Sequence, residues 1–313
     1  MTFVDAAPGV GFLRCAMVNV IAIGESSRWV LLDAGLPGYA DTIRRAAESR
    51  FGAGARPSAI VLTHGHFDHV GSLEELLDTW DVPVFAHRLE LPYLTGRSSY
   101  PPPDPLVGRG TMSLLSRLYS RGPIDISGRV AALPVDLSVP DLPGWRWIHT
   151  PGHTPGHVSL YRDADRCLLA GDAVTTTKQE SLNAVLTQRV ELHGPPAYFT
   201  QDWASAKDSV QLLARLAPDV LISGHGQPMN GEVMRSALHA LAEHFDARER
   251  PRYGRYAIQA AVADDTGTVI LPPDPLPKLL AGAGAAAAAL GVVWIAAAAR
   301  KRARAGRGTV PLP

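Results

Sequence analysis

The chain has 313 residues, of which 46% are hydrophobic, enough to fill the core of one large domain or two small ones. Its 30 Lys and Arg residues balance its 30 Asp and Glu residues, so it offers no basic field that would attract nucleic acid. Its cysteines, Cys15 and Cys167, provide neither a disulfide framework nor a CxxC metal site. The composition therefore excludes a disordered or disulfide-rich protein and argues against a nuclease.

The first part of the chain alternates strand-like apolar runs with amphipathic helical runs. Two β-rich runs, Phe12–Ile23 and Trp29–Asp33, flank the turn-forming segment Gly24–Ser27, which predicts a hairpin. This alternation predicts an α/β domain. Further strands are expected at Ala59–Thr63 and Val82–Ala86, and helices at Ala40–Ser49 and Ser72–Trp80.

A proline-rich and irregular region follows at 93–126, with a short helix expected at Met112–Tyr119. Because this region is inserted between elements of the predicted domain, we expect it to be a lid or a substrate-binding region. Regular elements then return. Strands are expected at Trp145–Thr150, Val158–Tyr161, Cys167–Ala170 and Val220–Ser223, and a helix at Ala204–Leu216.

The C-terminal end differs from residues 1–270, which we predict to be the main domain. Residues 271–278 are rich in proline and predict a stiff linker. The 21 residues from Leu279 to Ala299 carry no charge, and their number matches the roughly 20 residues of a transmembrane helix. We therefore predict an apolar helical tail that associates with a membrane, followed by a basic tail at 300–313. An alanine-rich helix packed on the domain and a low-complexity tail are the alternatives.

The orientation of this tail follows from charge. Basic residues after a membrane helix favour the cytoplasmic side, and no export signal precedes the main domain. A tail helix lying along the inner leaflet would satisfy both conditions. The prediction is thus a membrane-associated protein with a cytoplasmic main domain; a soluble cytoplasmic protein is the alternative.

The strongest functional signal is the segment HGHFDH, which follows the strand expected at Ala59–Thr63. Within six residues it presents three imidazoles and one carboxylate, those of His64, His66, His69 and Asp68. Histidine nitrogen and carboxylate oxygen are the usual protein ligands of zinc in catalytic sites. Four such groups so close together are difficult to explain by packing, so the segment predicts a metal site.

Three weaker signals also follow predicted strands. TPGHTPGH contains His153 and His157, AGD contains Asp172, and SGHG contains His225. Each is weak alone. Together with the first segment, and without His157, they supply seven candidate ligands from four strand-end loops, as active sites on rigid β scaffolds commonly do.

The ordered set THGHFDH, TPGHTPGH, AGD and SGHG resembles the metallo-β-lactamase superfamily over roughly residues 10–245, and is most similar to its glyoxalase II-like hydrolases. The resemblance implies a four-layer αβ/βα sandwich with the site along one edge. It also implies two metal ions, expected to be zinc, with iron or manganese as alternatives. The first ion would be held by His64, His66 and His153, the second by Asp68, His69 and His225, and Asp172 would bridge them.

The expected chemistry is attack of a metal-bound hydroxide on a carbonyl, with Asp68 orienting the nucleophile and carrying a proton. Asp33 and His157 are expected to support ligands through hydrogen bonds; a turn cap is the alternative for Asp33. The remaining histidines match no part of the set and are expected at the surface or in the core. They are His87, His149, His193, His239 and His244.

The predicted substrate is a small-molecule thioester, lactone or related ester, with no nucleic-acid partner. An aspartate at position 172 points away from the two-zinc β-lactamases, and no basic RNA-binding arm is visible. The main alternative is a persulfide dioxygenase with a single iron ion, which shares much of the histidine pattern. A β-lactamase, a phosphodiesterase and a non-catalytic metal-binding membrane protein are further alternatives.

Overall fold

A computed structural model of the protein describes residues 1–275. By its internal contacts the chain divides into two units, Met1–Pro272 and Pro273–Pro313, and the elements given below belong to the first. Within residues 1–275 no helix is long and apolar enough to cross a membrane. The predicted membrane helix Leu279–Ala299, the basic tail and the end of the predicted linker lie outside the described residues.

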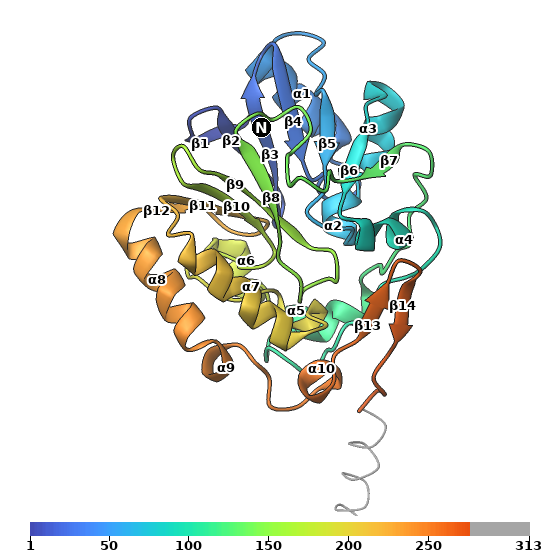
Figure 1. The fold of residues 1–313 in the computed structure, drawn as a ribbon, viewed down its shortest axis with the longest axis vertical. Coiled ribbons are helices and arrows are strands. Elements are labelled where there is room, and N and C mark those ends of the chain that lie inside the picture. The colour runs from blue at the N-terminus through green and yellow to red at the C-terminus, as the bar shows by residue number, and fades with distance from the viewer. Residues whose placement is uncertain (276–313) are drawn as a thin grey trace, which may run out of the picture. The chain divides into compact units, whose positions relative to one another are not determined.

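Seven strands form a first sheet in which antiparallel hairpins are followed by parallel strands (Figure 1). The strands are paired in sequence order: the first four are antiparallel, and the fourth to seventh are parallel. They are β1 (Val4–Ala7), β2 (Val10–Cys15), β3 (Val18–Glu25), β4 (Arg28–Leu32), β5 (Ala59–Val61), β6 (Val84–Ala86) and β7 (Val130–Ala132).

The predicted run Phe12–Ile23 is two strands rather than one. β2 ends at Cys15 and β3 begins at Val18, and Ala16 adopts a left-handed conformation with φ of 56° in the turn between them. The prediction missed this turn because neither glycine nor proline marks it. The hairpin predicted around Gly24–Ser27 is confirmed, since Glu25 of β3 pairs with Arg28 of β4.

Five strands of the C-terminal half form a second sheet, in the order β12-β11-β10-β9-β8. β10 and β11 are parallel, and the other neighbours are antiparallel. All four strands predicted in this half are confirmed. The sheet consists of β8 (Trp145–His149), β9 (Val158–Arg162), β10 (Cys167–Gly171), β11 (Val220–Ser223) and β12 (Met229–Asn230).

Three of the four longer helices form where amphipathic sequences predict them, and the fourth, Gly231–Glu243, was not predicted. The predicted helix Ala204–Leu216 is present one residue earlier, because Asp202 caps it by accepting hydrogen bonds from the N–H groups of Ala204 and Ser205. The longer helices are α1 (Ala40–Phe51), α3 (Leu73–Trp80), α7 (Trp203–Arg215) and α8 (Gly231–Glu243).

Shorter elements complete the unit. The short helix predicted in region 93–126 is α5 (Thr111–Leu115), continued by a 3-10 turn at Ser116–Leu118. The others are the helices α2 (Phe67–Val70), α4 (Leu91–Leu94), α6 (Leu182–Thr187), α9 (Phe245–Arg248) and α10 (Arg255–Ile258), the 3-10 turns Arg88–Glu90 and Ala197–Phe199, and the hairpin of β13 (Val262–Asp264) and β14 (Gly267–Ile270).

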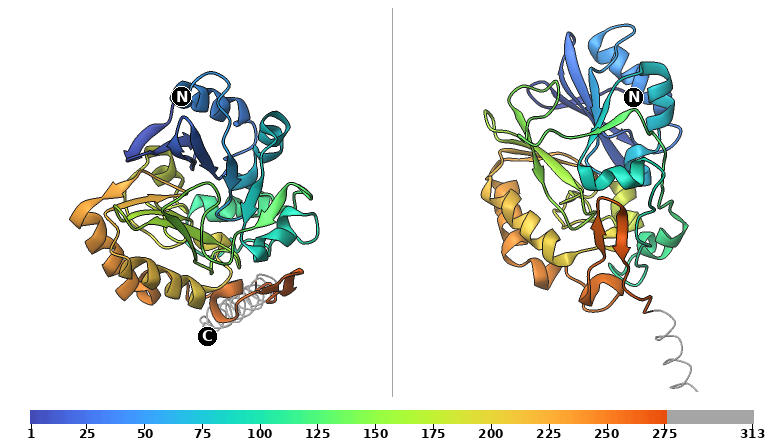
Figure 2. Two further views of the ribbon diagram at one scale, coloured as in Figure 1. Left: turned by 45° about the horizontal axis from the view of Figure 1, so that its top comes forward. Right: turned by 45° about the vertical axis from the view of Figure 1, so that its right-hand side comes forward.

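The two sheets pack face to face, and helices cover their outer faces (Figures 1 and 2). Successive side chains of a strand point to opposite faces. In β3, Val20 and Ala22 pack in a core with α1 and α3, whereas Ile21 and Ile23 pack against the second sheet, which contributes Trp147. The opposite face of the second sheet packs on α7 and α8. The predicted mixed α/β fold is therefore confirmed.

Candidate metal centre

Four segments that follow strands meet at one edge of the two sheets. HGHFDH follows β5, Asp172 follows β10, His225 follows β11, and the loop 150–157 joins β8 to β9. The backbone N–H of Val158 donates to the carbonyl of Thr63 at 3.0 Å. This hydrogen bond joins the loop that precedes Val158 to the loop that follows Thr63. Buried strands thus position every predicted ligand.

The first group consists of three imidazoles whose nitrogens converge. Nε2 of His64 lies 3.0 Å from Nδ1 of His66, and Nδ1 of His66 lies 3.0 Å from Nε2 of His153. All three rings are buried, and burial lowers the pKa of each, to about 4 for His153. Three neutral imidazoles that direct nitrogens to one point form the donor set that a metal ion in a catalytic site requires.

The second group consists of Asp68, His69 and His225. The candidate ligand atoms of these three buried residues lie within 4.8 Å of one another, and Nε2 of His225 lies 3.5 Å from Oδ2 of Asp68. Asp68 is the most exposed of the seven predicted ligands, at 8%. This carboxylate therefore lies on the side of the centre that a substrate would reach.

Asp172 lies between the two groups. Its Oδ2 is 3.1 Å from Nε2 of His225 and 3.5 Å from Nε2 of His153, and its Oδ1 is 3.5 Å from Nε2 of His69. Burial alone would raise the pKa of this carboxyl, but His225 and His69 overcome that effect and hold it well below its usual range. The group is therefore a carboxylate in contact with both sets.

Four buried atoms of the predicted ligands lack a hydrogen-bond partner among the described residues: Nε2 of His66, Nδ1 of His153, Nε2 of His69 and Oδ1 of Asp172. The last two face each other. The 3.5 Å between them is too long for a good hydrogen bond. A buried polar atom without a partner is costly, so two of them facing each other fit a cation held between them. The donor types also fit, because imidazole and carboxylate are ligands of zinc and iron.

Asp33 forms hydrogen bonds at both ends of the segment that contains His64 and His66. Its Oδ1 accepts from the N–H of Thr63 at 2.8 Å, and its Oδ2 accepts from the Thr63 hydroxyl and from Nδ1 of His69, each at 2.8 Å. Because Nδ1 of His69 faces Asp33, Nε2 is the nitrogen that faces the centre and would hold a metal ion. Asp33 thus connects a candidate ligand to the end of the segment that precedes the HGHFDH motif.

His157 occupies both of its ring nitrogens with protein groups. Nε2 accepts from the N–H of Asp172 at 2.8 Å, and Nδ1 donates to the Thr150 hydroxyl at 2.8 Å. Burial lowers the pKa of His157 to about 3, so the ring is neutral and can accept at Nε2. The residue therefore holds the backbone of Asp172 in place and has no nitrogen left for a metal ion.

Asn19 was missed by the analysis of the sequence. Its Nδ2 donates to the carbonyls of Ser223 and Gly226, at 3.0 and 2.7 Å, on either side of His225. Nδ1 of His225 in turn donates to the carbonyl of Met17 at 2.8 Å. A signal existed, because Asn19 is the only polar side chain in the apolar run from Val18 to Ile23.

Glu90 was missed as well, and no local signal marks it. Its carboxylate is fully buried and accepts hydrogen bonds from Gly65, Thr154, Gly156 and Tyr100. The first of these residues lies between His64 and His66, and two others follow His153. Glu90 therefore contacts both loops that form the first group.

Among residues 1–275, the other histidines lie outside both groups of candidate ligands. His87 stacks on His149 with ring centroids 4.3 Å apart, and burial lowers the pKa of His87 to about 3. His193 lies near Glu249, and His239 and His244 are exposed around the end of α8.

Aromatic and apolar side chains cover the centre. The ring of Phe199 lies 4.6 Å from that of His66, and Tyr119 packs between Phe67 and Phe199. Burial raises the pKa of Tyr119 and of Tyr198, and the charge of Asp68 raises both further. Both phenols therefore lie near that carboxylate. We call this cover the aromatic cap; it consists of Met17, Phe67, Val107, Met112, Tyr119, Ala197, Tyr198 and Phe199.

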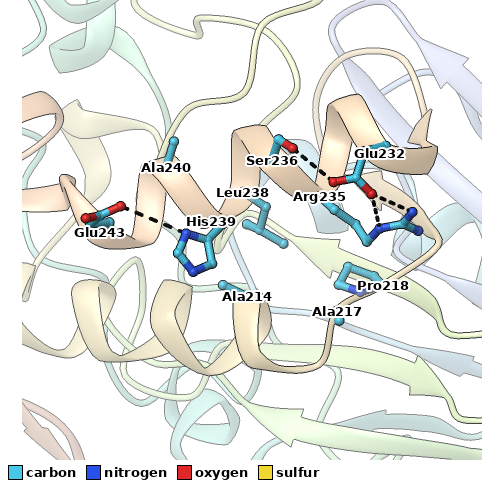
Figure 3. Close-up of a pocket in the computed structure, with 10 residues that line it drawn as sticks. All are labelled: Ala214, Ala217, Pro218, Glu232, Arg235, Ser236, Leu238, His239, Ala240 and Glu243. Carbon is cyan, nitrogen blue, oxygen red and sulfur yellow. Dashed lines mark hydrogen bonds and ion pairs between the residues drawn. The ribbon is translucent and has the colours of Figure 1, made fainter.

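Figure 3 shows a separate surface cleft of about 390 Å³ between α7 and α8. Its charged groups pair with one another: Arg235 bonds Glu232, and His239 lies 4.0 Å from Glu243. None of the candidate ligand groups in the described chain lies there. The cleft therefore adds nothing to the chemistry of the centre.

Comparisons with known proteins agree with this geometry. The sequence profile of the metallo-beta-lactamase superfamily matches residues 13–225. The protein named probable metallo-hydrolase YflN, from Bacillus subtilis (strain 168), is 51% identical over 246 residues, covering 78% of this chain and 93% of that protein. Probable metallo-hydrolase YybB from the same organism is 32% identical, covering 63% of this chain and 75% of that protein.

Two solved structures show the same fold at low sequence identity. A beta-lactamase domain protein from Burkholderia ambifaria is 22% identical with a TM-score of 0.54, covering 78% of this chain and 76% of that one. A subclass B3 metallo-β-lactamase with an active-site glutamic acid is 19% identical with a TM-score of 0.51, covering 77% of this chain and 87% of that one. Both likenesses concern the fold alone.

Proposed function

This chain belongs to the metallo-β-lactamase superfamily, and we propose that it is a glyoxalase II-like hydrolase with a dinuclear metal centre that cleaves a small-molecule thioester, lactone or related ester. The observation that carries the proposal is the position of Asp172. Its Oδ2 lies within 3.5 Å of His153 in the first group and within 3.1 Å of His225 in the second. A carboxylate so placed is suited to bridge two ions.

Each of the two groups would hold one metal ion. His64, His66 and His153 would hold one ion, and Asp68, His69 and His225 the other. Two divalent ions in these positions would lower the pKa of a water nucleophile and polarise the carbonyl of the substrate. Zinc is the ion we expect, with iron or manganese as alternatives of similar ligand preference.

Asp68 has the position required of a proton carrier. It is the least buried of the candidate ligands, and burial raises the pKa of its carboxyl, which eases the uptake of a proton. Its Oδ2 can receive the proton released by the water nucleophile and pass it to the departing oxygen or sulfur. The phenols of Tyr119 and Tyr198 lie near this carboxylate, on the side that a substrate would reach.

The aromatic cap supports a substrate with an apolar part. Phe199 and Tyr119 offer ring faces beside His66 and Asp68, and Met112 adds a flexible apolar side chain. The chain has no net charge, which gives no reason to expect an extended polyanion in the site. A small uncharged or weakly charged ester fits this surface better than a nucleic acid.

Metal content and a substrate panel test the proposal together. We expect about two equivalents of zinc per chain at saturation, and hydrolysis of a thioester or lactone in preference to a β-lactam or a phosphodiester. His239→Ala, which alters an exposed histidine outside the centre, is the control for non-specific zinc binding. A plateau at one equivalent, with iron-dependent oxygen consumption on a persulfide, would instead establish the dioxygenase alternative.

A further inference from the structure

Glu90 lies between the two loops that carry the histidines of the first group. Its Oε1 accepts from the Thr154 hydroxyl at 2.8 Å and from the N–H of Gly156 at 2.7 Å. Its Oε2 accepts from the N–H of Gly65 at 3.1 Å and from the Tyr100 hydroxyl. One oxygen therefore faces the loop of His153, and the other faces the loop of His64 and His66.

The two loops belong to different sheets, so their spacing depends on tertiary contacts. The loop of His64 and His66 follows β5 in the first sheet, and the loop of His153 precedes β9 in the second. The hydrogen bond from Val158 to Thr63 joins the loops at one end, and Glu90 joins them at the other. Between these links, Nδ1 of His66 and Nε2 of His153 approach to 3.0 Å.

Glycines in both metal-binding motifs make room for this link. A Cβ at Gly156 would lie 2.8 Å from Oε1 of Glu90, and a Cβ at Gly65 would lie 2.7 Å from the Tyr100 hydroxyl. Neither distance is tolerable for a carbon atom. Gly65 of HGH and Gly156, which precedes His157, are therefore explained by the close approach of Tyr100 and Glu90.

Tyr100 extends the link to the predicted substrate region. Its hydroxyl donates to Glu90, its ring lies 4.6 Å from that of His66, and it stacks on Tyr93 at 4.0 Å. The N–H of Gly65 also donates to the Tyr100 hydroxyl at 2.9 Å. Glu90 thus receives four hydrogen bonds, which together connect three separate segments.

We propose that Glu90 is a positioning residue that sets the spacing of His64, His66 and His153, and thereby the affinity of the protein for its first metal ion. The inference rests on the proposed metal-dependent function and adds a residue outside its ligand set. A carboxylate can accept all four hydrogen bonds at once, whereas an amide cannot. Groups that orient metal ligands commonly contribute roughly 10- to 100-fold to the affinity for the metal ion.

Glu90→Gln tests this role with little change of shape. Its NH₂ group must face the N–H of either Gly65 or Gly156, neither of which can accept a hydrogen bond, so one loop loses its anchor. We expect the affinity for the first zinc ion to fall roughly 10- to 100-fold. The affinity is measured by competition with a chromogenic chelator, starting from metal-free protein. In the Co²⁺ form the visible absorption of the first site should change as well.

A His225→Ala background restricts the titration to the first group, because it removes a ligand of the second. Glu180→Gln is the matched control: Glu180 is also buried and accepts one N–H, from Ala197 at 2.7 Å, outside the loops of the centre. We expect Glu180→Gln to leave the affinity for the first zinc ion and the Co²⁺ spectrum unchanged. Any loss of thermal stability is then compared between the two buried-carboxylate variants.

Thr154→Val is the second variant and decides the matter if Glu90→Gln does not fold. It removes one of the two bonds to the loop of His153 while the carboxylate stays, so a severalfold loss of first-site affinity is expected. Unchanged affinity and spectrum in the folded variant would overturn the role of Glu90. Parent protein that binds no metal at the first group would instead contradict the proposed function.

Discussion

At the scale of single residues, Asp172 contacts both groups of candidate ligands, so its removal tests whether it bridges two metal ions. We expect Asp172→Ala to bind about one zinc ion instead of about two and to lose activity by at least roughly 100-fold. The variant should stay folded, because the apolar cores do not include Asp172. Zinc analysis, turnover and circular dichroism measure the three quantities.

Asp136→Ala is the control for this prediction, since Asp136 is an exposed aspartate that bonds only to nearby Ser138 among the contacts described. It should retain both metal content and turnover. Near-normal turnover of Asp172→Ala would refute the bridging position of this carboxylate.

The buried histidines predict how pH affects the stability of the metal-free protein. Burial lowers the pKa of His153 to about 4 and of His87 and His157 to about 3, from an ordinary value of 6.5. Below pH 6.5 the unfolded state therefore binds more protons than the folded state. The free energy of unfolding then decreases as the pH is lowered. We expect the melting temperature to decrease steadily between pH 6.5 and pH 4.

His69 and His225 have the opposite sign. Burial would lower their pKa, but Asp172 raises it above the ordinary value in both. The stability they contribute is present below pH 6.5 and is lost as the pH rises through their folded pKa values. Because the contribution of these two histidines does not change below pH 6.5, the histidines with a lowered pKa decide the trend there, and acid should destabilise the metal-free protein. Calorimetry that finds an equal or higher melting temperature at pH 5 than at pH 6.5 would contradict this.

At the scale of elements, Asn19 couples β3 to the turn that presents His225. Asn19→Ala removes two buried hydrogen bonds and leaves the carbonyls of Ser223 and Gly226 without that donor. We expect the free energy of unfolding of the metal-free protein to fall by about 2 kcal/mol, as measured by urea denaturation. Since the freed turn carries His225, the second zinc ion should also bind more weakly.

Asn230→Ala is the comparison for Asn19→Ala, because Asn230 is an exposed asparagine at the start of α8 without a side-chain cap bond. Its effect on both quantities should be small. An equal loss of stability in the two variants would show that Asn19 has no special role in this turn.

The region 93–126 contributes Val107, Met112 and Tyr119 to the aromatic cap. We expect Tyr119→Ala to raise KM and to change the preference among ester substrates, while the metal content stays at the level of the parent protein. Tyr119 packs on Phe67 and Phe199 but belongs to none of the ligand groups, which separates substrate contact from metal binding.

Leu118→Ala, one residue away and 80% exposed, is the matched control and should leave KM unchanged. Loss of metal from Tyr119→Ala in proportion to its loss of activity would refute a role of this region in substrate binding.

At the scale of the whole molecule, the predicted C-terminal anchor is tested apart from the hydrolase. The uncharged residues 279–299 and the basic residues after them predict membrane association, and a version ending at Pro277 lacks both. We expect the full chain in the membrane fraction of expressing cells and the shortened version in the supernatant, with equal specific activity. Recovery of both versions wholly in the supernatant would show that the tail is not an anchor.

The sequence by itself predicted the α/β class and most strands, because buried strands are continuous apolar runs and their ends carry polar motifs. It missed the turn at Ala16 because no glycine or proline stands there. It also selected His64, His66, Asp68, His69, His153, Asp172 and His225 as candidate ligands, because few other roles suit such residues directly after buried strands.

Only the tertiary structure decided which atoms of those residues meet and what holds them there. Asn19 contacts the turn of His225 across 204 positions of sequence, and Glu90 reaches Gly156 across 66. A polar residue in an apolar run, such as Asn19, indicates only that its side chain needs a partner, and nothing in the sequence near Glu90 or Asn19 says which distant group that partner is. Their partners become visible only when strand pairing and sheet packing bring the loops together.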